Sequence, residues 1–192
     1  DAWSLSNDND FLAGGIRSGI TGFRADLIVV DDPIKGREEA ESKLIRDKTW
    51  DEYQDSIRTR LKPGGRIVLI QTRWHEDDLA GRILPEGYDG ATGWVDGRDG
   101  ERWYVICIPA EADRADDPLG RKPGELFWPQ WFPKSHWTAF RQDPRTWASL
   151  CQQKPKPDEG AFFKRGWFHR FRLAELPPSV RYYVTSDYAT KD

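Results

Sequence analysis

Two short, uninterrupted hydrophobic runs stand out in the first half of the chain, at residues 27–30 (Leu-Ile-Val-Val) and 67–70 (Ile-Val-Leu-Ile). Runs of this kind are typical of strands that are buried on both faces of a sheet. Between them lies a charged stretch, residues 37–61, in which hydrophobic residues recur at a spacing of three or four. This periodicity predicts an amphipathic helix, and the Lys-Pro-Gly-Gly sequence at 62–65 ends it.

The order strand, long helix, strand predicts a βαβ unit, in which a right-handed crossover usually makes the two strands parallel and often neighbours. Asp31 and Asp32 follow the first run, and Gln71 and Thr72 follow the second. If the strands are neighbours, these four residues gather at the carboxyl edge of one sheet. Open α/β sheets bind their ligands at that edge. We therefore expect an α/β fold with a ligand site there.

The rest of the chain predicts further elements and two boundaries. The acids at 76–78 suit the start of a helix that runs to about residue 84. Residues 87–100 lack periodicity and predict an exposed loop, residues 103–108 a third strand, and residues 134–153 a helix. The amino-acid composition changes near residue 111, and two prolines follow at 177 and 178. These features divide the chain into regions 1–110, 111–178 and 179–192, with a strand expected at 182–187 in the last.

Composition narrows the class of protein. The 192 residues include ten Trp, too much large hydrophobic surface for a disordered chain, and no Met, so we expect a piece of a longer protein. No hydrophobic stretch approaches the roughly 20 residues that span a bilayer, and no leader opens the chain, which predicts a soluble intracellular protein. Cys107 and Cys151 lie in unrelated contexts, which favours buried thiols over a disulfide or a zinc site.

The net charge of the chain is compatible with a local patch that binds nucleic acid, but it argues against a surface that binds nucleic acid throughout. The formal net charge is −3, unlike that of a surface that coats a polyanion. Basic and aromatic residues nevertheless interleave near the C-terminus, where they form either a DNA-facing patch or a solvated rim around an aromatic anchor. They are Lys154, Lys156, Lys164, Arg165, Arg170 and Arg172, with Phe162, Phe163, Trp167, Phe168 and Phe171.

A hydrophobic strand that ends in two acids is the Walker B arrangement of P-loop ATPases. Asp31 would then hold Mg²⁺, directly or through its water, and Asp32 would orient and deprotonate the attacking water. An Asp-Asp-Pro turn after a strand is also ordinary loop chemistry. The chain has no GxxxxGK[ST] phosphate loop, because the glycine-rich residues 14–22 lack its Lys. These glycines predict tight turns before the strand, and we expect the phosphate loop upstream of Asp1.

Several ordered motifs resemble the large subunit of the terminase of tailed double-stranded DNA phages. Residues 19–33, 37–40 and 70–79 look like its ATPase domain, and residues 151–157, with Gly160, Phe163, Lys164, Trp167 and Phe168, are similar to its linker to the nuclease domain. The resemblance implies part of a P-loop ATPase sheet with flanking helices at 1–110, a linker subdomain at 111–178, and the first strand of a ribonuclease-H-like nuclease domain at 179–192.

The resemblance also implies roles for individual residues. Asp31 is the Walker B metal ligand and Asp32 the catalytic carboxylate, where the family often has Glu. Thr72 falls in the coupling motif and senses the γ-phosphate, and Gln71 beside it also binds the nucleotide. The alternative for Thr72 is a helix-capping hydroxyl ahead of residue 76. Asp187 matches the first nuclease acid, which holds Mg²⁺ or Mn²⁺ together with further acids. The alternative for Asp187 is a plain strand-end acid.

The implied function is ATP-driven translocation and cleavage of double-stranded DNA during phage genome packaging, in the cytoplasm of the infected or lysogenic host. The implied partners are DNA, the small terminase subunit, the portal protein and further copies in a ring on the capsid, with no membrane. The piece itself is expected to be inactive, since both catalytic sites lack parts. Two alternatives stay open: a non-catalytic DNA-binding or capsid-docking module, and another P-loop ATPase such as a helicase.

Three further residues have two readings each. Arg17 and Arg24 precede the acidic strand, and one of them could reach the nucleotide of a neighbouring subunit and stabilise transition-state charge. Surface or ion-paired arginines are more common. His75 is a lone histidine that follows Trp74 near the sheet edge, which favours a structural hydrogen-bonding role over that of a metal ligand.

Overall fold

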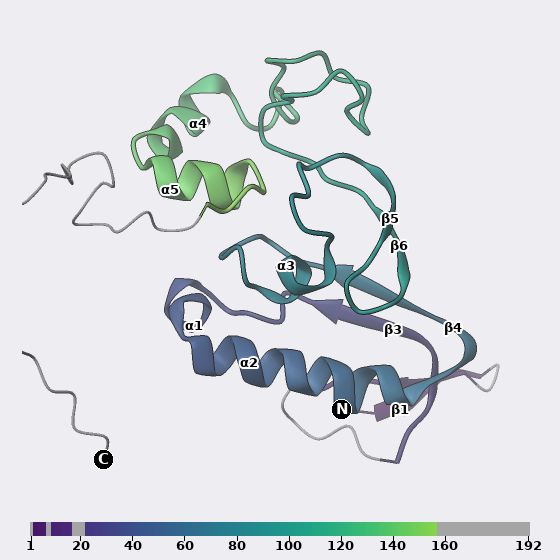
Figure 1. Cartoon of the computed structure of the whole chain (residues 1–192). Coiled ribbons are helices and arrows are strands. Elements are labelled where there is room, and N and C mark those ends of the chain that lie inside the picture. Colours follow the sequence, from purple (N-terminus) through teal and green to yellow (C-terminus); the bar gives the residue numbers. More distant parts are fainter. Residues whose placement is uncertain (1, 7–8, 17–21, 157–192) are drawn as a thin grey trace, which may run out of the picture. The chain divides into compact units, whose positions relative to one another are not determined.

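A parallel pair of strands, β3 (Ala25–Asp31) and β4 (Leu61–Ile70), forms the framework of the computed structural model, which describes residues 2–6, 9–16 and 22–156 (Figure 1). Leu27 to Asp31 lie opposite Arg66 to Ile70 in regular register. The pairing is irregular between Ala25 and Leu27, because the segment containing Gly64, at φ 79°, bulges out of β4. The predicted parallel strand pair is therefore confirmed.

The crossover between the strands is helical but broken. It consists of α1 (Arg37–Glu41), α2 (Lys43–Asp51), the π-helical η1 (Glu52–Ile57) and the 3₁₀-helical η2 (Arg58–Arg60). The sequence predicts one helix over 37–61, but Ser42 has extended backbone angles and accepts a hydrogen bond from the Ile45 N–H. A serine that caps α2 in this way ends one helix and begins the next.

The hydrophobic core lies against one face of the strand pair. Its buried members come from β3, η1 and α3 (Leu79–Ile83), and they are Val30, Tyr53, Ile57, Leu79 and Ile83. Ile28, Ile67 and Leu69 of the strands pack against this cluster. Hydrophobic residues at a helical spacing thus meet the alternate residues of two strands, which is the arrangement that the crossover pattern predicts.

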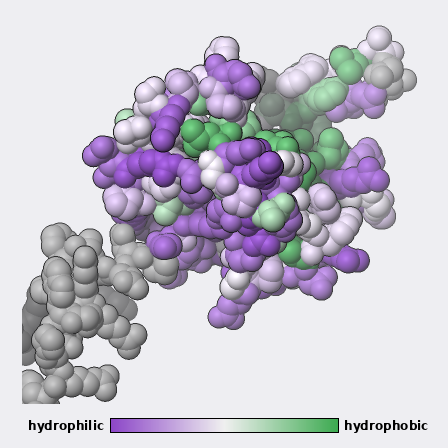
Figure 2. Space-filling view, turned by 90° about the horizontal axis from the view of Figure 1, so that it is seen from above, coloured by the Kyte–Doolittle hydropathy of each residue, from purple (hydrophilic) through white to green (hydrophobic). Residues whose placement is uncertain are grey.

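The opposite face of the strand pair is hydrophobic and exposed within the described residues. Leu27, Val29, Val68 and Ile70 are 57, 55, 43 and 53% exposed. The prediction that both runs are buried on both faces is therefore wrong for this part of the chain, where the helices pack on only one face. Seen from above, the described part of the molecule carries hydrophobic residues that are bordered by hydrophilic ones (Figure 2).

A separate hairpin follows α3. β5 (Gly93–Asp96) and β6 (Arg102–Val105) pair antiparallel, and the Arg98 N–H donates to the Ile83 carbonyl at the end of α3. The expected loop over 87–100 is thus wrong in part, because it contains β5. The predicted strand at 103–108 exists in shorter form, paired with β5. Gly100, at φ 86°, supplies the left-handed residue that lets this short hairpin turn.

The C-terminal part of the described chain is helical in short pieces. These are α4 (Lys134–Arg141), α5 (Pro144–Thr146) and the π-helical η3 (Trp147–Cys151). The single helix predicted over 134–153 is interrupted because Pro144 cannot continue the backbone ladder, and Asp143 caps the next turn by accepting from the Arg145 and Thr146 N–H groups.

Other features complete the description. A hairpin of β1 (Ala2–Ser4) and β2 (Asp10–Leu12), which the sequence did not predict, opens the chain. Both cysteines are free thiols, Cys151 buried and Cys107 partly buried. None of the helices in the described ranges is long and hydrophobic enough to cross a bilayer. The boundary at 177–178 and the strand at 182–187 lie outside the described residues.

Candidate functional site

The ends of β3 and β4 are joined by two hydrogen bonds that involve Asp32. The Asp32 N–H donates to the Ile70 carbonyl at 2.9 Å, which continues the parallel ladder by one residue. The Asp32 carboxylate in turn accepts the Thr72 N–H at 2.9 Å through Oδ1. The structure thus brings Asp31, Asp32, Gln71 and Thr72 together at the carboxyl edge, where the sequence predicts a ligand site.

Asp32 has a strained backbone. Its φ is 37°, in the left-handed region that a residue with a Cβ occupies at a cost of about 1–2 kcal/mol. Asp is among the few residue types that tolerate this region, and the following Pro33 disfavours the ordinary helical alternative. The two hydrogen bonds hold this conformation, which turns the chain sharply and points the carboxylate toward the loop after β4.

Asp31 and Asp32 are both exposed and offer hard oxygen ligands. Asp31 shares the face of β3 that carries Val29, away from the hydrophobic core. Among the described residues there is no group of three or more His, Cys, Asp or Glu side chains that could hold a metal. Two carboxylates fit Mg²⁺, because this ion keeps several waters and takes its remaining ligands from phosphates.

Gln71 and Thr72 form the other half of the site. The Gln71 Oε1 accepts the Ala80 N–H at 3.2 Å, whereas its Nε2 is buried without a hydrogen-bond partner. A buried amide that lacks a partner costs about 1–3 kcal/mol. Thr72 does not cap the following helix, since Asp78 accepts the Gly81 N–H at 2.8 Å and is the N-cap of α3. The capping alternative for Thr72 is therefore wrong.

A buried ion pair that the sequence reasoning missed supports the loop after β4. The Nε of Arg73 donates to both carboxylate oxygens of Asp78 at 3.0 Å, and the Asp78 side chain is fully buried. The same carboxylate caps α3 and accepts the His75 N–H at 3.4 Å. The Arg73 and Asp78 pair thus folds residues 73–78 into a compact turn, and a capping acid before the Leu-Ala-Gly sequence was the available signal.

His75 also belongs to this turn. Its Nδ1 accepts the Asp77 N–H at 2.9 Å, which is a structural hydrogen bond of the kind expected from the sequence. Gly81 packs so closely behind the turn that a Cβ at its position would lie 1.8 Å from the Glu76 carbonyl oxygen. The turn therefore requires glycine at residue 81.

A second group of charges fastens the turn to α2. Asp77 accepts hydrogen bonds from Arg46 at 3.0 Å and from Arg82 at 2.7 and 2.9 Å, and Arg82 also donates to Asp47 at 2.7 Å. Partial burial pushes the pKa of the Asp77 carboxyl upward, but the hydrogen bonds from Arg82 and Arg46 outweigh it and hold that pKa below its ordinary value. The loop after β4 is consequently held both by its own Arg73 and Asp78 pair and by the contact of Asp77 with Arg46 of α2.

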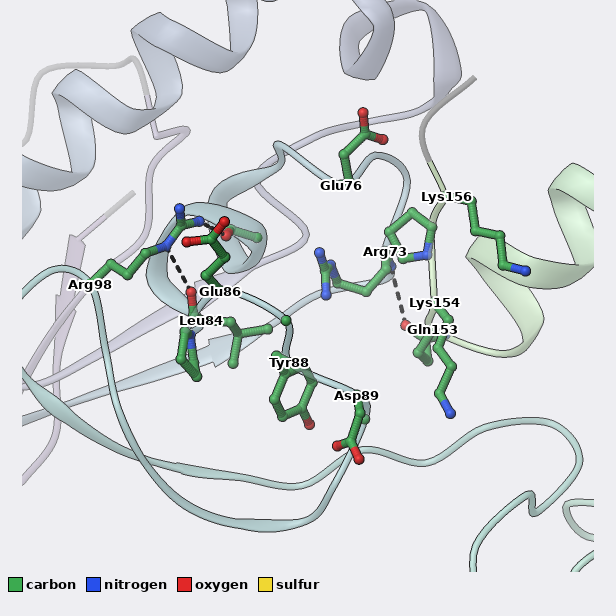
Figure 3. Close-up of a pocket in the computed structure, with 15 residues that line it drawn as sticks. Arg73, Glu76, Leu84, Glu86, Tyr88, Asp89, Arg98, Gln153, Lys154 and Lys156 are labelled. Atoms are coloured by element: carbon green, nitrogen blue, oxygen red, sulfur yellow. Dashed lines mark hydrogen bonds between the residues drawn. The ribbon is translucent and has the colours of Figure 1, made fainter. Parts of the chain in front are cut away.

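A cavity of about 340 Å³ lies beside this turn (Figure 3). Its lining includes Arg73, Tyr88, Arg98, Gln153 and Lys154. Burial raises the pKa of the Tyr88 phenol. Asp31, Asp32 and Thr72 do not line this cavity, so it is distinct from the predicted nucleotide site.

Several sequence-predicted residues fall elsewhere. Arg24 is exposed just before β3, and Lys154 forms an ion pair with Asp113. Arg17, Asp187 and the aromatic and basic residues at 162–172 lie outside the described residues. The predicted nuclease acid and most of the interleaved basic patch therefore stay predictions.

Comparison with known families gives one match. The model of the family described as terminase large subunit, T4likevirus-type, N-terminal, matches residues 11–170. That range contains the whole β3 to β4 unit, the turn after β4 and the helical segment up to η3. No curated protein and no solved structure matches the chain significantly.

Proposed function

The chain belongs to the family of terminase large subunit N-terminal regions, which serves phage DNA packaging, and on this premise we propose that the protein hydrolyses ATP at the β3 and β4 edge to drive double-stranded DNA into a capsid. The observation that carries the proposal is the hydrogen bond from the Thr72 N–H to the Asp32 carboxylate. It places the proposed catalytic acid and the proposed phosphate sensor in direct contact.

The two acids have separate roles in this proposal. Asp31, exposed at the last position of β3, holds Mg²⁺ directly or through a water. When bound, Mg²⁺ neutralises charge on the transferring phosphate. Asp32 orients and deprotonates the attacking water with the part of its carboxylate that Thr72 does not occupy. The strained backbone of Asp32 supports the assignment, since such conformations cluster at functional sites.

Thr72 connects the proposed ATPase site to the loop after β4. Because the Asp32 carboxylate accepts the Thr72 N–H, a shift of the loop after β4 changes the position of the proposed base. Gln71 contributes an amide whose Nε2 has no partner, and we assign it as a donor that a phosphate or its water satisfies. Loss of the γ-phosphate would then change the hydrogen bonds of Gln71 and the position of Thr72 at the same time.

The wider activity follows from the family and is also a proposal. The complete protein carries a phosphate loop and a metal-dependent nuclease domain that begins near Asp187 and uses Mg²⁺ or Mn²⁺. It works as a ring with the small terminase subunit and the portal protein in the host cytoplasm.

ATP hydrolysis by the complete protein tests the proposal. Asp32→Asn keeps the acceptor for the Thr72 N–H but removes the base, so kcat is expected to fall by about 100-fold or more. Asp26→Asn is the matched control, because Asp26 lies on the same strand and is exposed in an ion pair with Lys62. Equal rates for Asp32→Asn and the wild type would exclude Asp32 as the base, and a wild type that does not hydrolyse ATP would favour a non-catalytic docking module.

A further inference from the structure

Two neighbouring glutamines at the end of η3 bind the backbones of two different loops. The Gln152 side chain accepts the Glu111 N–H and donates to the Glu111 carbonyl, each at 3.0 Å. The Gln153 side chain accepts the Arg73 N–H at 3.1 Å and donates to the Leu150 carbonyl at 2.7 Å. Both amides are therefore satisfied on both sides, which fixes their orientation.

The Gln153 contact reaches the proposed ATPase site within one residue. Arg73 directly follows Thr72, whose own N–H is bound by Asp32. Consecutive N–H groups of one loop are thus held by two side chains, Asp32 at the end of β3 and Gln153 at the end of η3. Figure 3 shows Gln153 beside Arg73 at the wall of the cavity, with the hydrogen bond drawn between them.

Backbone hydrogen bonds around Gln153 fix the position from which its side chain binds the Arg73 N–H. Its φ is 56°, and the Lys154 N–H donates back to the Ala148 carbonyl at 2.8 Å, while the Gln152 N–H donates to the Trp147 carbonyl at 2.9 Å. A left-handed residue with such bonds is a common way for a helical segment to end. Gln153 therefore sets the direction in which residues 154–156 leave η3.

We propose that Gln153 is a positioning residue that couples the loop carrying Thr72 to the segment that follows η3. This inference rests on the proposed ATPase function and adds a route by which the nucleotide state reaches that segment. A hydrogen bond tolerates a shift of only a few tenths of an ångström before it weakens. Movement of Arg73 therefore either moves Gln153 with it or breaks the bond. Movement of residues 154–156 in the same way shifts the loop that carries Thr72 or breaks the bond.

The test compares the two glutamines in the complete protein. Gln153→Ala and Gln153→Met remove the bond to the Arg73 N–H, and Met preserves the side-chain volume. Both are expected to lower kcat for ATP by about 3- to 10-fold, the effect of one hydrogen bond, with KM within about twofold. Gln153→Glu keeps the acceptor and is expected to recover at least half of the loss. Gln152→Ala, which frees Glu111 instead, leaves kcat within about twofold.

The outcomes separate this inference from the function on which it rests. An active wild type with equal kcat in Gln153→Ala, Gln153→Met and Gln152→Ala overturns the coupling role alone. A parallel fall of kcat and melting temperature in the Gln152 and Gln153 variants makes both glutamines merely structural, which also overturns it. A wild type that does not hydrolyse ATP with DNA present overturns the proposed function and the inference together.

Discussion

Different forces hold the turn after β4 and the aromatic segment around α4. In residues 71–78 the contacts are polar and buried: Asp78 is fully buried and the Arg73 side chain is 12% exposed. In residues 127–147 aromatic rings touch one another in a chain, from Phe127 through Phe132 and Trp137 to Trp147. Other rings of the segment are open to solvent, since Trp131 is 68% exposed.

The difference teaches how each region responds to change. A buried ion pair has one geometry, and removal of either partner leaves a charge without compensation. Ring contacts are many and weak, each contributing about 0.5–1.5 kcal/mol beyond the area buried, so the loss of one leaves the others in place. One substitution in the turn is therefore expected to disrupt the whole turn. In the aromatic segment, the loss in the free energy of unfolding is expected to follow the burial of the ring removed.

Removal of the buried carboxylate is expected to have the largest effect. Asp78→Ala leaves Arg73 buried and unpaired and removes the N-cap of α3, so we expect a loss of about 4 kcal/mol in the free energy of unfolding. Denaturant unfolding of the chain measures it. Asp116→Ala is the control, since Asp116 pairs with Arg114 in an exposed position and its loss is expected to cost far less. Similar losses for both would remove the contrast.

A methyl group behind the turn is expected to be the next most damaging change. Gly81→Ala places a Cβ 1.8 Å from the Glu76 carbonyl oxygen and 3.0 Å from the Arg73 guanidinium, so the turn must shift. We expect a loss of about 3 kcal/mol. Gly36→Ala is the matched control, because a Cβ there meets nothing within 4 Å. A Gly81→Ala chain with wild-type stability would mean that the turn yields without penalty.

Two tryptophans sharpen the comparison within the aromatic segment. Trp137 is half-buried and contacts Phe132, His136, Phe140 and Trp147, whereas Trp131 is mostly exposed. Trp137→Ala is expected to cost about 2 kcal/mol, and Trp131→Ala less than about 0.5 kcal/mol. Melting temperatures of the two variants check the order. A reversed order would show that burial does not control stability there.

The smallest expected effect is a dependence of stability on pH. The pKa of Asp77 in the folded chain lies below its value of about 3.9 in the unfolded chain. Its ion pairs therefore stabilise the fold above about pH 4, and that contribution is lost as the pH falls through the lowered pKa. Asp77→Asn is expected to reduce the slope of unfolding free energy between about pH 5 and 2. An unchanged slope would contradict the lowered pKa.

Local sequence determined the part of the fold that follows from short-range patterns. Hydrophobic runs at 27–30 and 67–70 and a helical period between them sufficed to predict the parallel pair, because a long helical crossover leaves few arrangements for two buried strands. The meeting of Asp31 and Asp32 with Gln71 and Thr72 followed from that pairing. The same reasoning overlooked the break at Ser42, where a capping hydrogen bond outweighs the helical period.

Only the tertiary structure decided which polar groups meet. The Asp78 cap of α3 can be read from its place directly before Leu79, but packing decides that the same buried carboxylate also pairs with Arg73. The bond between Arg73 and Gln153 joins residues 80 positions apart. Periodicity and turn chemistry act over a few residues and can be read from the chain, whereas side-chain hydrogen bonds between distant loops exist only once packing has brought the loops together.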